Sequence, residues 1–234
     1  MKSFDIITLT VNPALDKSAH FSGLIPEQKI RCEAPLYDAG GGGINVSKAI
    51  SRLEGTSLAV IASGGPSGEM IKEILHKESI AFHAIETKNW TRESFVAVDD
   101  NTNSQYRFNF PGTSISNTEK NEIICAVEGL ESRYLVLSGS LREGLSVDFY
   151  QKMAKIGKQS NARVIVDTSG EALKKVLETG VYMIKPNVGE LAKLIGVEHL
   201  EMEEVSDAAR KIIAVGGAEI VVVSLGPQGA VLVT

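Results

Sequence analysis

The chain has 234 residues, of which 43% are hydrophobic and 23% are charged, as in ordinary globular proteins with one large or two small α/β domains. Its net charge of −5 and lack of a basic run argue against a nucleic-acid partner, and no apolar stretch approaches the ~20 residues of a membrane span. The two distant cysteines, Cys32 and Cys125, and a short polar N-terminus without signal-peptide character predict a cytoplasmic protein that does not bind membranes.

Short apolar runs rich in β-branched residues recur along the chain and are typical of buried parallel strands. We predict strands at Ile6–Thr10, Leu58–Ser63, Tyr134–Ser138, Val164–Asp167, Tyr182–Lys185 and Ile220–Ser224. Helical periodicity predicts helices at Ile44–Leu53, Gly68–Lys77, Asn117–Leu130, Val147–Gln159, Gly170–Leu177, Val188–Ile195 and Val205–Val215. This alternation predicts an α/β fold with a doubly wound, mostly parallel sheet that carries helices on both faces.

Two stretches interrupt the alternation, and both read as strands or hairpins. They are Ala19–Ala34 and Glu93–Phe110, and the second contains a turn at Asp99–Asn103 between two alternating runs. Inserts of this kind form a cover over a ligand site, a contact between subunits or a simple extension of the sheet edge. Periodicity does not distinguish among these three roles.

Polar, glycine-rich stretches follow most of the predicted strands. They are Asn12–Asp16, Ser63–Gly68, Ser138–Gly144, Asp167–Gly170, Pro186–Glu190 and Leu225–Gly229. Ligands of open parallel sheets bind beyond the carboxyl ends of the strands, so these stretches predict one composite site, although each could be a plain connection. No GxxxxGK[ST] motif occurs, which excludes a P-loop nucleotide site.

Four consecutive glycines, at positions 40–43, run directly into the predicted helix that starts at Ile44. Such a run has a high conformational entropy cost, and it suits a backbone that approaches another group closely or needs a positive φ. The N-terminus of the following helix favours polar or anionic ligands. A ligand loop is therefore one interpretation, and a glycine-rich turn before an ordinary helix is the other.

Motifs distributed over nearly the whole chain resemble those of the PfkB (ribokinase-like) carbohydrate kinases and keep their order. They are TLTVNPALD (8–16), GGGGINVSKAI (40–50), NWTR (89–92), SGSL (138–141), VDTSGEAL (166–173), KPNVGEL (185–191) and VVVSLGPQGA (221–230). The resemblance implies one ribokinase-like domain over residues 1–234, with a small antiparallel β lid formed by inserts at about 17–34 and 93–110. The uncharged Gly42, KIRC (29–32) and QYRFNFPG (105–112) resemble the branch of the family that phosphorylates fructose 6-phosphate.

The resemblance implies a sugar-phosphate site. Asp16 and Asn45 would bind sugar hydroxyls beside the backbone of Gly41, Gly42 and Gly43; Lys29, Arg31 and Arg92 would bind the phosphate; and Ser138 or Ser140 would line the pocket. Taken alone, Asp16 reads as a turn cap after the first strand, and the three cations read as solvated surface charges. Arg142 follows this serine loop where relatives often carry proline.

The resemblance also implies ATP and Mg²⁺ as cofactors. Lys185, Asn187, Ser224, Gly226 and Gly229 would lie along ATP, and Asn187 with Glu190 would hold Mg²⁺ through water, since this ion keeps most of its waters. Asn187 and Glu190 also have the spacing of a capping box at a helix start, and the two roles are compatible.

The family's DTxGAGD signature, which carries its catalytic aspartate and anion hole, does not occur up to Thr234, and the last residues, AVLVT (230–234), read as an apolar strand. The expectation is therefore a C-terminally incomplete domain without its own catalytic base and with impaired activity. The resemblance implies conversion of fructose 6-phosphate to fructose 1,6-bisphosphate in glycolysis, by a homodimer joined through the lid strands. Phosphorylation of tagatose 6-phosphate or fructose 1-phosphate is one alternative, and a non-catalytic protein that binds sugar phosphate or ATP is another.

Overall fold

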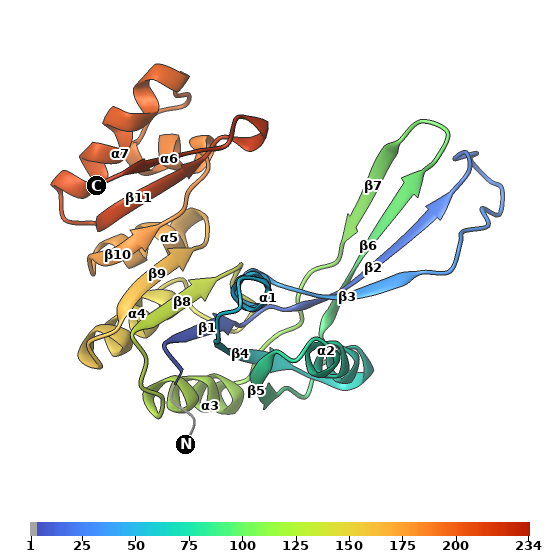
Figure 1. Cartoon of the computed structure of the whole chain (residues 1–234), viewed down its shortest axis with the longest axis horizontal. Coiled ribbons are helices and arrows are strands. Elements are labelled where there is room, and N and C mark those ends of the chain that lie inside the picture. Colours follow the sequence, from blue (N-terminus) through green and yellow to red (C-terminus); the bar gives the residue numbers. More distant parts are fainter. Residues whose placement is uncertain (1–3) are drawn as a thin grey trace.

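The computed structural model describes residues 4–234 and contains a large main sheet and a smaller sheet that projects from it (Figure 1). The main sheet has the strand order β12-β11-β10-β9-β8-β1-β4-β5. Its strands are β1 (Ile6–Thr10), β4 (Leu58–Ser63), β5 (Ala81–Glu86), β8 (Tyr134–Ser138), β9 (Arg163–Asp167), β10 (Val181–Ile184), β11 (Ala218–Ser224) and β12 (Ala230–Val233). Neighbouring strands are parallel except β11 and β12, which confirms the predicted doubly wound α/β fold.

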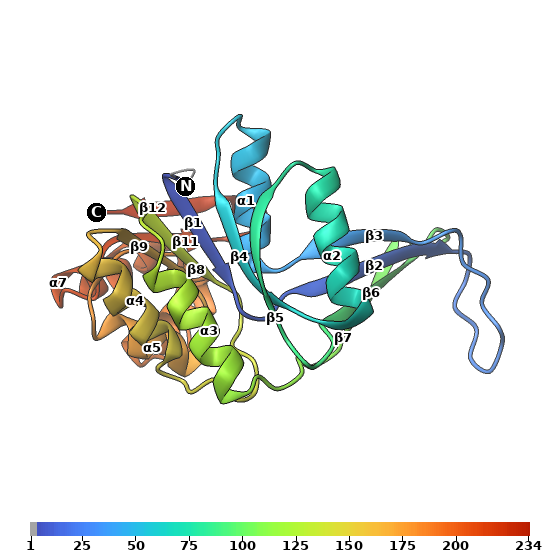
Figure 2. The ribbon, with the colours of Figure 1, turned by 90° about the horizontal axis from the view of Figure 1, so that it is seen from below.

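Helices cover the main sheet from both sides (Figure 2). They are α1 (Gly42–Arg52), α2 (Gly65–Lys77), α3 (Asn117–Glu128), α4 (Phe149–Gln159), α5 (Gly170–Leu177), α6 (Val188–Ile195) and α7 (Val205–Ala214), with short 3-10 turns at Met202–Glu204 and Gly226–Gln228. Alternate residues of β4 divide between two cores: Ala59 and Ile61 pack with α1 and α2, whereas Val60 and Ala62 belong to the core shared with α3–α7. Both faces of β4 are buried, which explains its continuous apolar run.

The smaller sheet, called the lid here, has the strand order β3-β2-β6-β7. Its strands are β2 (Ala14–Phe21), β3 (Leu36–Gly40), β6 (Arg92–Asp99) and β7 (Ser104–Asn109). The expectation of an antiparallel lid is partly wrong, because β2 and β6 pair in parallel and only the outer pairs are antiparallel. The first insert also differs from its prediction: Asp16 lies inside β2, and residues 22–35 form a long connection with an isolated bridge at Cys32.

Strand β5 was not predicted from the sequence, whereas β12 confirms the apolar strand expected at the end of the chain. β5 is an edge strand in which exposed residues alternate with partly buried ones and with the buried Ile85, so it lacks the continuous apolar run of the central strands. A strand that is buried on one face only has a weaker hydrophobic signal, which is why β5 was missed.

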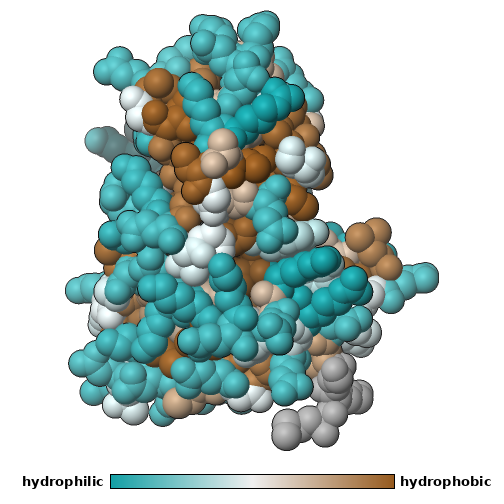
Figure 3. All heavy atoms as spheres, turned by 90° about the vertical axis from the view of Figure 1, so that its left-hand side faces the viewer, coloured by the Kyte–Doolittle hydropathy of each residue, from teal (hydrophilic) through white to brown (hydrophobic). Residues whose placement is uncertain are grey.

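Hydrophobic side chains reach the surface around the last strands and helices of the chain (Figure 3). Val215 and Leu232 are the most exposed large apolar residues in this part. On the sheet face occupied elsewhere by α1, Ile165, Met183 and Ile220 are paired side by side and remain partly exposed. Within residues 4–234, no helix has both the length and the apolar character needed to cross a membrane.

Candidate functional site

The glycines before α1 are packed against polar side chains of other elements. A Cβ atom added to Gly40 would lie 2.0 Å from Oδ2 of Asp16, and one added to Gly42 would lie 2.1 Å from Oγ of Ser138. Side chains cannot approach so closely without displacing their neighbours. The glycine run therefore brings the backbone of the α1 start into contact with two residues of the predicted sugar site.

The start of α1 is also held by the end of β1. Gly41 caps the helix with φ 126°, a left-handed conformation that favours glycine, and the amide of Ile44 donates to Oγ1 of Thr10 at 3.0 Å. A Cβ atom on Gly43 would lie 2.5 Å from the same Oγ1 atom. Amides of the first turn have no partner within their own helix, so the amides of Gly42 and Gly43 are available to a ligand.

A pocket of about 470 Å³ lies where the lid joins the start of α1. It is lined by Ala14, Asp16, Lys17, Ser18, Leu36, Tyr37, Asp38, Gly41, Arg92, Ser94, Val96, Arg107 and Asn109. Burial is the largest influence on the pKa of Asp16 and raises it. The positive charges of Arg92 and Lys48 lower the pKa and the negative charge of Asp38 raises it, and the net shift is upward. The pocket thus unites Asp16, Gly41 and Arg92, which the sequence placed in the same site.

Strand pairing adds lid residues that sequence reasoning did not identify. Ser94 pairs with Asp16 on one side and with Asn109 on the other, and Ser94 Oγ donates to Asn109 Oδ1 at 3.0 Å. Arg107 lies two positions before Asn109 in β7 and therefore shares its face of the lid. The period-2 pattern of residues 104–109 could have revealed this pair, but the sequence does not show which face turns toward Asp16.

Arg92 is the first residue of β6, and its Nε atom is buried without a hydrogen-bond partner in the described structure. A buried guanidinium N–H without a partner is costly, and an anionic ligand in the pocket would provide one. This geometry agrees with the phosphate-binding role expected for Arg92.

Lys29 and Arg31 do not lie in the Asp16 pocket of the same chain. They line a separate hollow of about 320 Å³ with His20, Gly23 and Asp100, at the outer end of β2. Phe21, the last residue of β2, is five positions beyond Asp16, which corresponds to about 17 Å along a strand. The structure therefore separates two of the three cations predicted for one phosphate site.

The serines after β8 lie next to the start of α1. Ser138 is buried, and its hydroxyl donates to Oδ2 of Asp167 at 3.3 Å. Lys185 lies 3.1 Å from the other carboxylate oxygen of Asp167. Ser140 is exposed and accepts a hydrogen bond from Nδ2 of Asn12 at 3.0 Å. The carboxyl ends of β8, β9 and β10 are thus joined by polar contacts.

The predicted ATP residues lie at and after the carboxyl ends of β10 and β11. Asn187 and Ser224 form an isolated parallel bridge, so the two strand ends lie side by side. The capping box is present: Asn187 Oδ1 accepts from the Glu190 amide at 2.8 Å, and Glu190 Oε2 accepts from the Asn187 amide at 2.9 Å. Glu190 Oε1 remains available to a hydrated cation, which fits a magnesium site reached through water.

Gly226 and Gly229, the other predicted ATP residues, lie in the turn between β11 and β12. Their φ values are 62° and 93°, which disfavour side chains, and no atom lies within 4 Å of a Cβ added to either. The open space leaves the backbone accessible to a ligand. Within the described range, no cluster of three or more His, Cys, Asp or Glu side chains is arranged to hold a metal ion.

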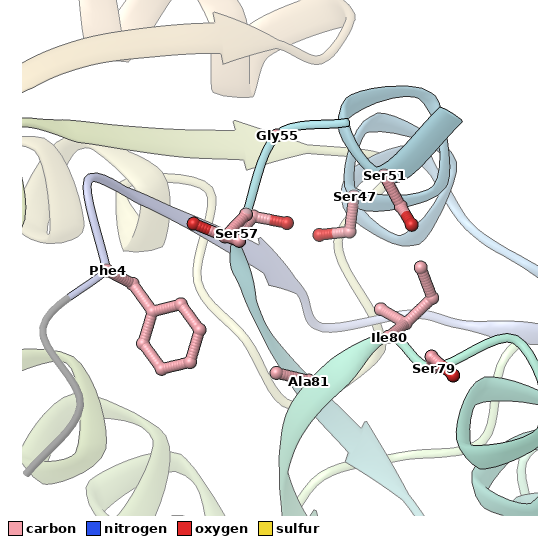
Figure 4. Close-up of a pocket in the computed structure, with 9 residues that line it drawn as sticks. Phe4, Ser47, Ser51, Gly55, Ser57, Ser79, Ile80 and Ala81 are labelled. Atoms are coloured by element: carbon pink, nitrogen blue, oxygen red, sulfur yellow. The ribbon is translucent and has the colours of Figure 1, made fainter. Parts of the chain in front are cut away.

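Another pocket, of about 480 Å³, lies at the amino ends of the strands, on the side of the sheet away from the Asp16 pocket (Figure 4). Its lining includes Ser47, Ser51 and Ser57 with Phe4 and Ile80, at the amino ends of β1, β4 and β5. None of the predicted site residues line it, and ligands of parallel sheets bind at the carboxyl ends. The Asp16 pocket is therefore the better candidate site.

Lys48 links the lid to the helices beneath it. This side chain of α1 is 6% exposed and forms ion pairs with Asp38 in β3 and with Glu78, 3.3 Å away at the end of α2. Both carboxylates are much more exposed than the lysine. The pairs connect the inner end of β3 with α1 and α2.

Comparison with known protein families shows which family the chain resembles. Residues 3–234 match the pfkB family carbohydrate kinases. The chain is 41% identical over 231 residues to the ATP-dependent 6-phosphofructokinase isozyme 2 of Mycobacterium tuberculosis, covering 98% of this chain and 68% of that protein. It is 39% identical over 227 residues to the isozyme 2 of Escherichia coli and 35% identical over 230 residues to a 1-phosphofructokinase of Bacillus subtilis, covering 74% and 75% of those proteins.

Solved structures give the same result. The Escherichia coli phosphofructokinase-2 in complex with fructose-6-phosphate aligns with a TM-score of 0.93 at 38% identity, over 98% of this chain and 76% of that one. The tetrameric inhibited form of the same enzyme aligns with a TM-score of 0.92 over the same shares of the two chains. The chain therefore belongs to the pfkB family of carbohydrate kinases, which are phosphotransferases.

Proposed function

We propose that the protein is an ATP-dependent kinase of fructose 6-phosphate that forms fructose 1,6-bisphosphate. The observation that carries this proposal is the pocket at the lid base, which combines the Asp16 carboxylate with the guanidinium groups of Arg92 and Arg107. A carboxylate accepts hydrogen bonds from sugar hydroxyls, and guanidinium groups bind phosphate with two parallel hydrogen bonds. The relatives named 6-phosphofructokinase support the choice of sugar.

The sugar would lie between the lid and the start of α1. Asp16 and Asn45 bind its hydroxyls, the amides of Gly42 and Gly43 face it, and Arg92 pairs with its phosphate. Ser138 and Ser140 close the side of the pocket next to β8. The 1-hydroxyl then points toward the carboxyl ends of β9–β11, where the nucleotide binds.

ATP would lie along the ends of β10 and β11. Lys185 places a positive charge beside the phosphates, Asn187 and Glu190 orient a hydrated Mg²⁺, and the turn with Gly226 and Gly229 lies against the nucleotide. Mg²⁺ supplies neutralisation of the phosphate charge when it is bound. The hydroxyl oxygen would attack the γ-phosphorus, the bond to the β,γ-bridging oxygen would break so that ADP leaves with that oxygen, and the hydroxyl would release its proton to water.

Isothermal titration with fructose 6-phosphate, tagatose 6-phosphate and fructose 1-phosphate tests the sugar assignment. We expect fructose 6-phosphate to bind most tightly, and Arg92→Ala to weaken its binding about 100-fold while ATP binding changes by less than about twofold. The matched control is Arg210→Ala, an exposed arginine of α7. Preference for another sugar would contradict the substrate, and equal losses of sugar and ATP binding would assign Arg92 a structural role.

The proposal includes a homodimer joined through the lid strands. One lid face carries Phe95 and Phe108, stacked with ring centroids 6.0 Å apart, and Phe108 is 50% exposed. Lys29 and Arg31, which lie away from the pocket of their own chain, could then reach the phosphate in the partner's pocket. Sedimentation equilibrium at micromolar concentration should give a dimer that Phe108→Asp dissociates, and a wild-type monomer would contradict the proposal.

A further inference from the structure

Arg142 lies in the loop after β8 and is 4% exposed. A buried guanidinium is uncommon, because taking its charge out of water costs several kcal/mol unless strong partners replace the water. Within the described part of the chain, no carboxylate lies within 4 Å of it. The charge of Arg142 is therefore stabilised by neutral hydrogen-bond acceptors, and the segments that carry these acceptors indicate the role of the side chain.

The partners of Arg142 are oxygen atoms from two other segments. Its Nε donates to the carbonyl oxygen of Thr113 at 2.8 Å, one terminal nitrogen donates to Oγ1 of Thr113, and the other donates to the carbonyl oxygen of Ala62 at 3.2 Å. Burial lowers the pKa of Arg142, Glu119 raises it and Arg92 lowers it. An arginine remains charged under these conditions, and charge-assisted hydrogen bonds are about twice as strong as neutral ones.

Thr113 extends these contacts to the other side of the lid. Its hydroxyl accepts from Arg142 and donates to the carbonyl oxygen of Trp90 at 2.9 Å. The neighbouring amide of Ile115 donates to the carbonyl oxygen of Glu143 at 2.8 Å, which joins the same two segments a second time. Arg142 thus connects the loop after β8 with the segment around Thr113 and, through it, with Trp90.

The segments around Trp90 and Thr113 are the two ends of the β6–β7 hairpin. Trp90 lies two residues before β6, which begins at Arg92, and Thr113 lies four residues after β7, which ends at Asn109 (Figure 1). The loop of Arg142 also carries Ser140, which accepts a hydrogen bond from Asn12. One buried side chain therefore holds the base of the lid hairpin against the strand ends of the main sheet.

We propose that Arg142 is a positioning residue for the sugar phosphate, because it sets the position of the β6–β7 hairpin, and with it Arg92, relative to the serine loop after β8. The inference rests on the proposed sugar-phosphate site at Arg92. Arg142 is not among the residues that line the Asp16 pocket, and three of its five N–H groups donate to Thr113 and Ala62, so it acts through the lid and not on the sugar phosphate directly. It acts on the lid side of the site and leaves the ATP side, at β10 and β11, unchanged.

The experiment compares Arg142→Gln and Arg142→Lys with the wild type in separate titrations of fructose 6-phosphate and ATP. We expect Arg142→Gln to weaken sugar-phosphate binding about tenfold, as for the loss of a charge-assisted hydrogen bond, with less than about twofold change for ATP. Arg142→Lys should restore part of the loss, because it keeps the charge without the planar fork. Arg210→Gln, exposed on α7, is the matched control.

Hydrogen exchange provides a readout that does not depend on the ligand. Amide exchange in Arg142→Gln should accelerate at residues 89–92 and 110–116, and it should remain at the wild-type rate in β10 and β11. Where Arg142→Gln does not fold, Thr113→Val makes the same test, since it removes only the hydroxyl between Arg142 and Trp90. It should also weaken sugar-phosphate binding and accelerate the same amides.

Three results would overturn the inference: equal losses of sugar and ATP binding, unchanged sugar binding in a folded variant, or exchange that accelerates throughout the chain. A wild-type chain that binds no fructose 6-phosphate would contradict the proposed function instead. In that case the exchange rates of the hairpin ends still decide whether Arg142 holds the lid.

Discussion

Gly42 and Ser138 are in such close contact that a methyl group on the glycine would lie 2.1 Å from the serine hydroxyl. The same methyl group would lie 3.0 Å from the backbone of Ser138 and Gly139, so a rotation of the hydroxyl alone relieves only part of the clash. Two segments nearly 100 positions apart in the chain are thereby held face to face at the carboxyl ends of β1 and β8.

Gly42→Ala should therefore impair the sugar site. The displaced Ser138 hydroxyl loses its hydrogen bond to Asp167, and we expect fructose 6-phosphate binding to weaken about tenfold and the free energy of unfolding to fall by about 1–2 kcal/mol. Titration and urea unfolding measure the two effects. Gly189→Ala is the matched control, since the nearest atom to its added Cβ is 3.5 Å away. Wild-type sugar binding in Gly42→Ala would show that the contact is not required.

Asp16→Asn should change the stability of the fold and the binding of the sugar phosphate in opposite directions, and the change in stability should depend on pH. Folding raises the pKa of Asp16, mainly through burial with a further contribution from Asp38, against the opposing charges of Arg92 and Lys48. The folded protein therefore holds this proton more tightly than the unfolded chain, so ionisation of Asp16 lowers stability as the pH rises from about 3.8 through the raised pKa. Asparagine does not ionise and escapes this loss.

We thus expect Asp16→Asn to gain stability relative to the wild type between about pH 4 and pH 7, while sugar-phosphate binding is lost. Urea unfolding at several pH values measures the first effect and titration at pH 7 the second. Asp207→Asn, at an exposed carboxylate of α7, is the control for a simple change in net charge. A stability difference that grows toward acidic pH would contradict the assigned cause.

Replacing Lys48 should lower the free energy of unfolding less than replacing its two carboxylate partners. In Lys48→Met, the carboxylates of Asp38 and Glu78 are exposed enough to be hydrated, and the apolar chain fills the same space, so we expect a loss of about 1 kcal/mol or less. The double variant Asp38→Asn, Glu78→Gln leaves a buried ammonium without a counter-charge and should cost about 3 kcal/mol. Thermal and urea unfolding compare the two variants. Equal costs would show that the lysine has access to water in the folded protein.

The central strands could be predicted from the sequence because they are buried on both faces. β1, β4 and β8 were predicted with the bounds that the structure shows, and the glycine run was assigned correctly to a helix start. Local patterns also predicted the Asn187–Glu190 capping box, since both partners lie within one turn. The edge strand β5 was missed because it buries one face, and the parallel pairing of β2 with β6 joins segments that no local pattern connects.

The candidate site also contains residues that the sequence predicted and residues that only the structure revealed. Asp16, Gly42 and Arg92 were chosen because they lie in motifs that resemble those of the PfkB kinases; taken alone, Asp16 reads as a turn cap and Arg92 as a solvated surface charge. Arg107 and Arg142 could not be chosen, because their roles depend on which face of the lid turns inward and on the burial of one side chain. Lys29 and Arg31 were grouped with Arg92 by chemistry, but the length of β2 separates them within one chain. Motifs in the sequence thus identify candidate residues, whereas the distances between remote segments arise only when the burial of apolar faces brings strands and lid together.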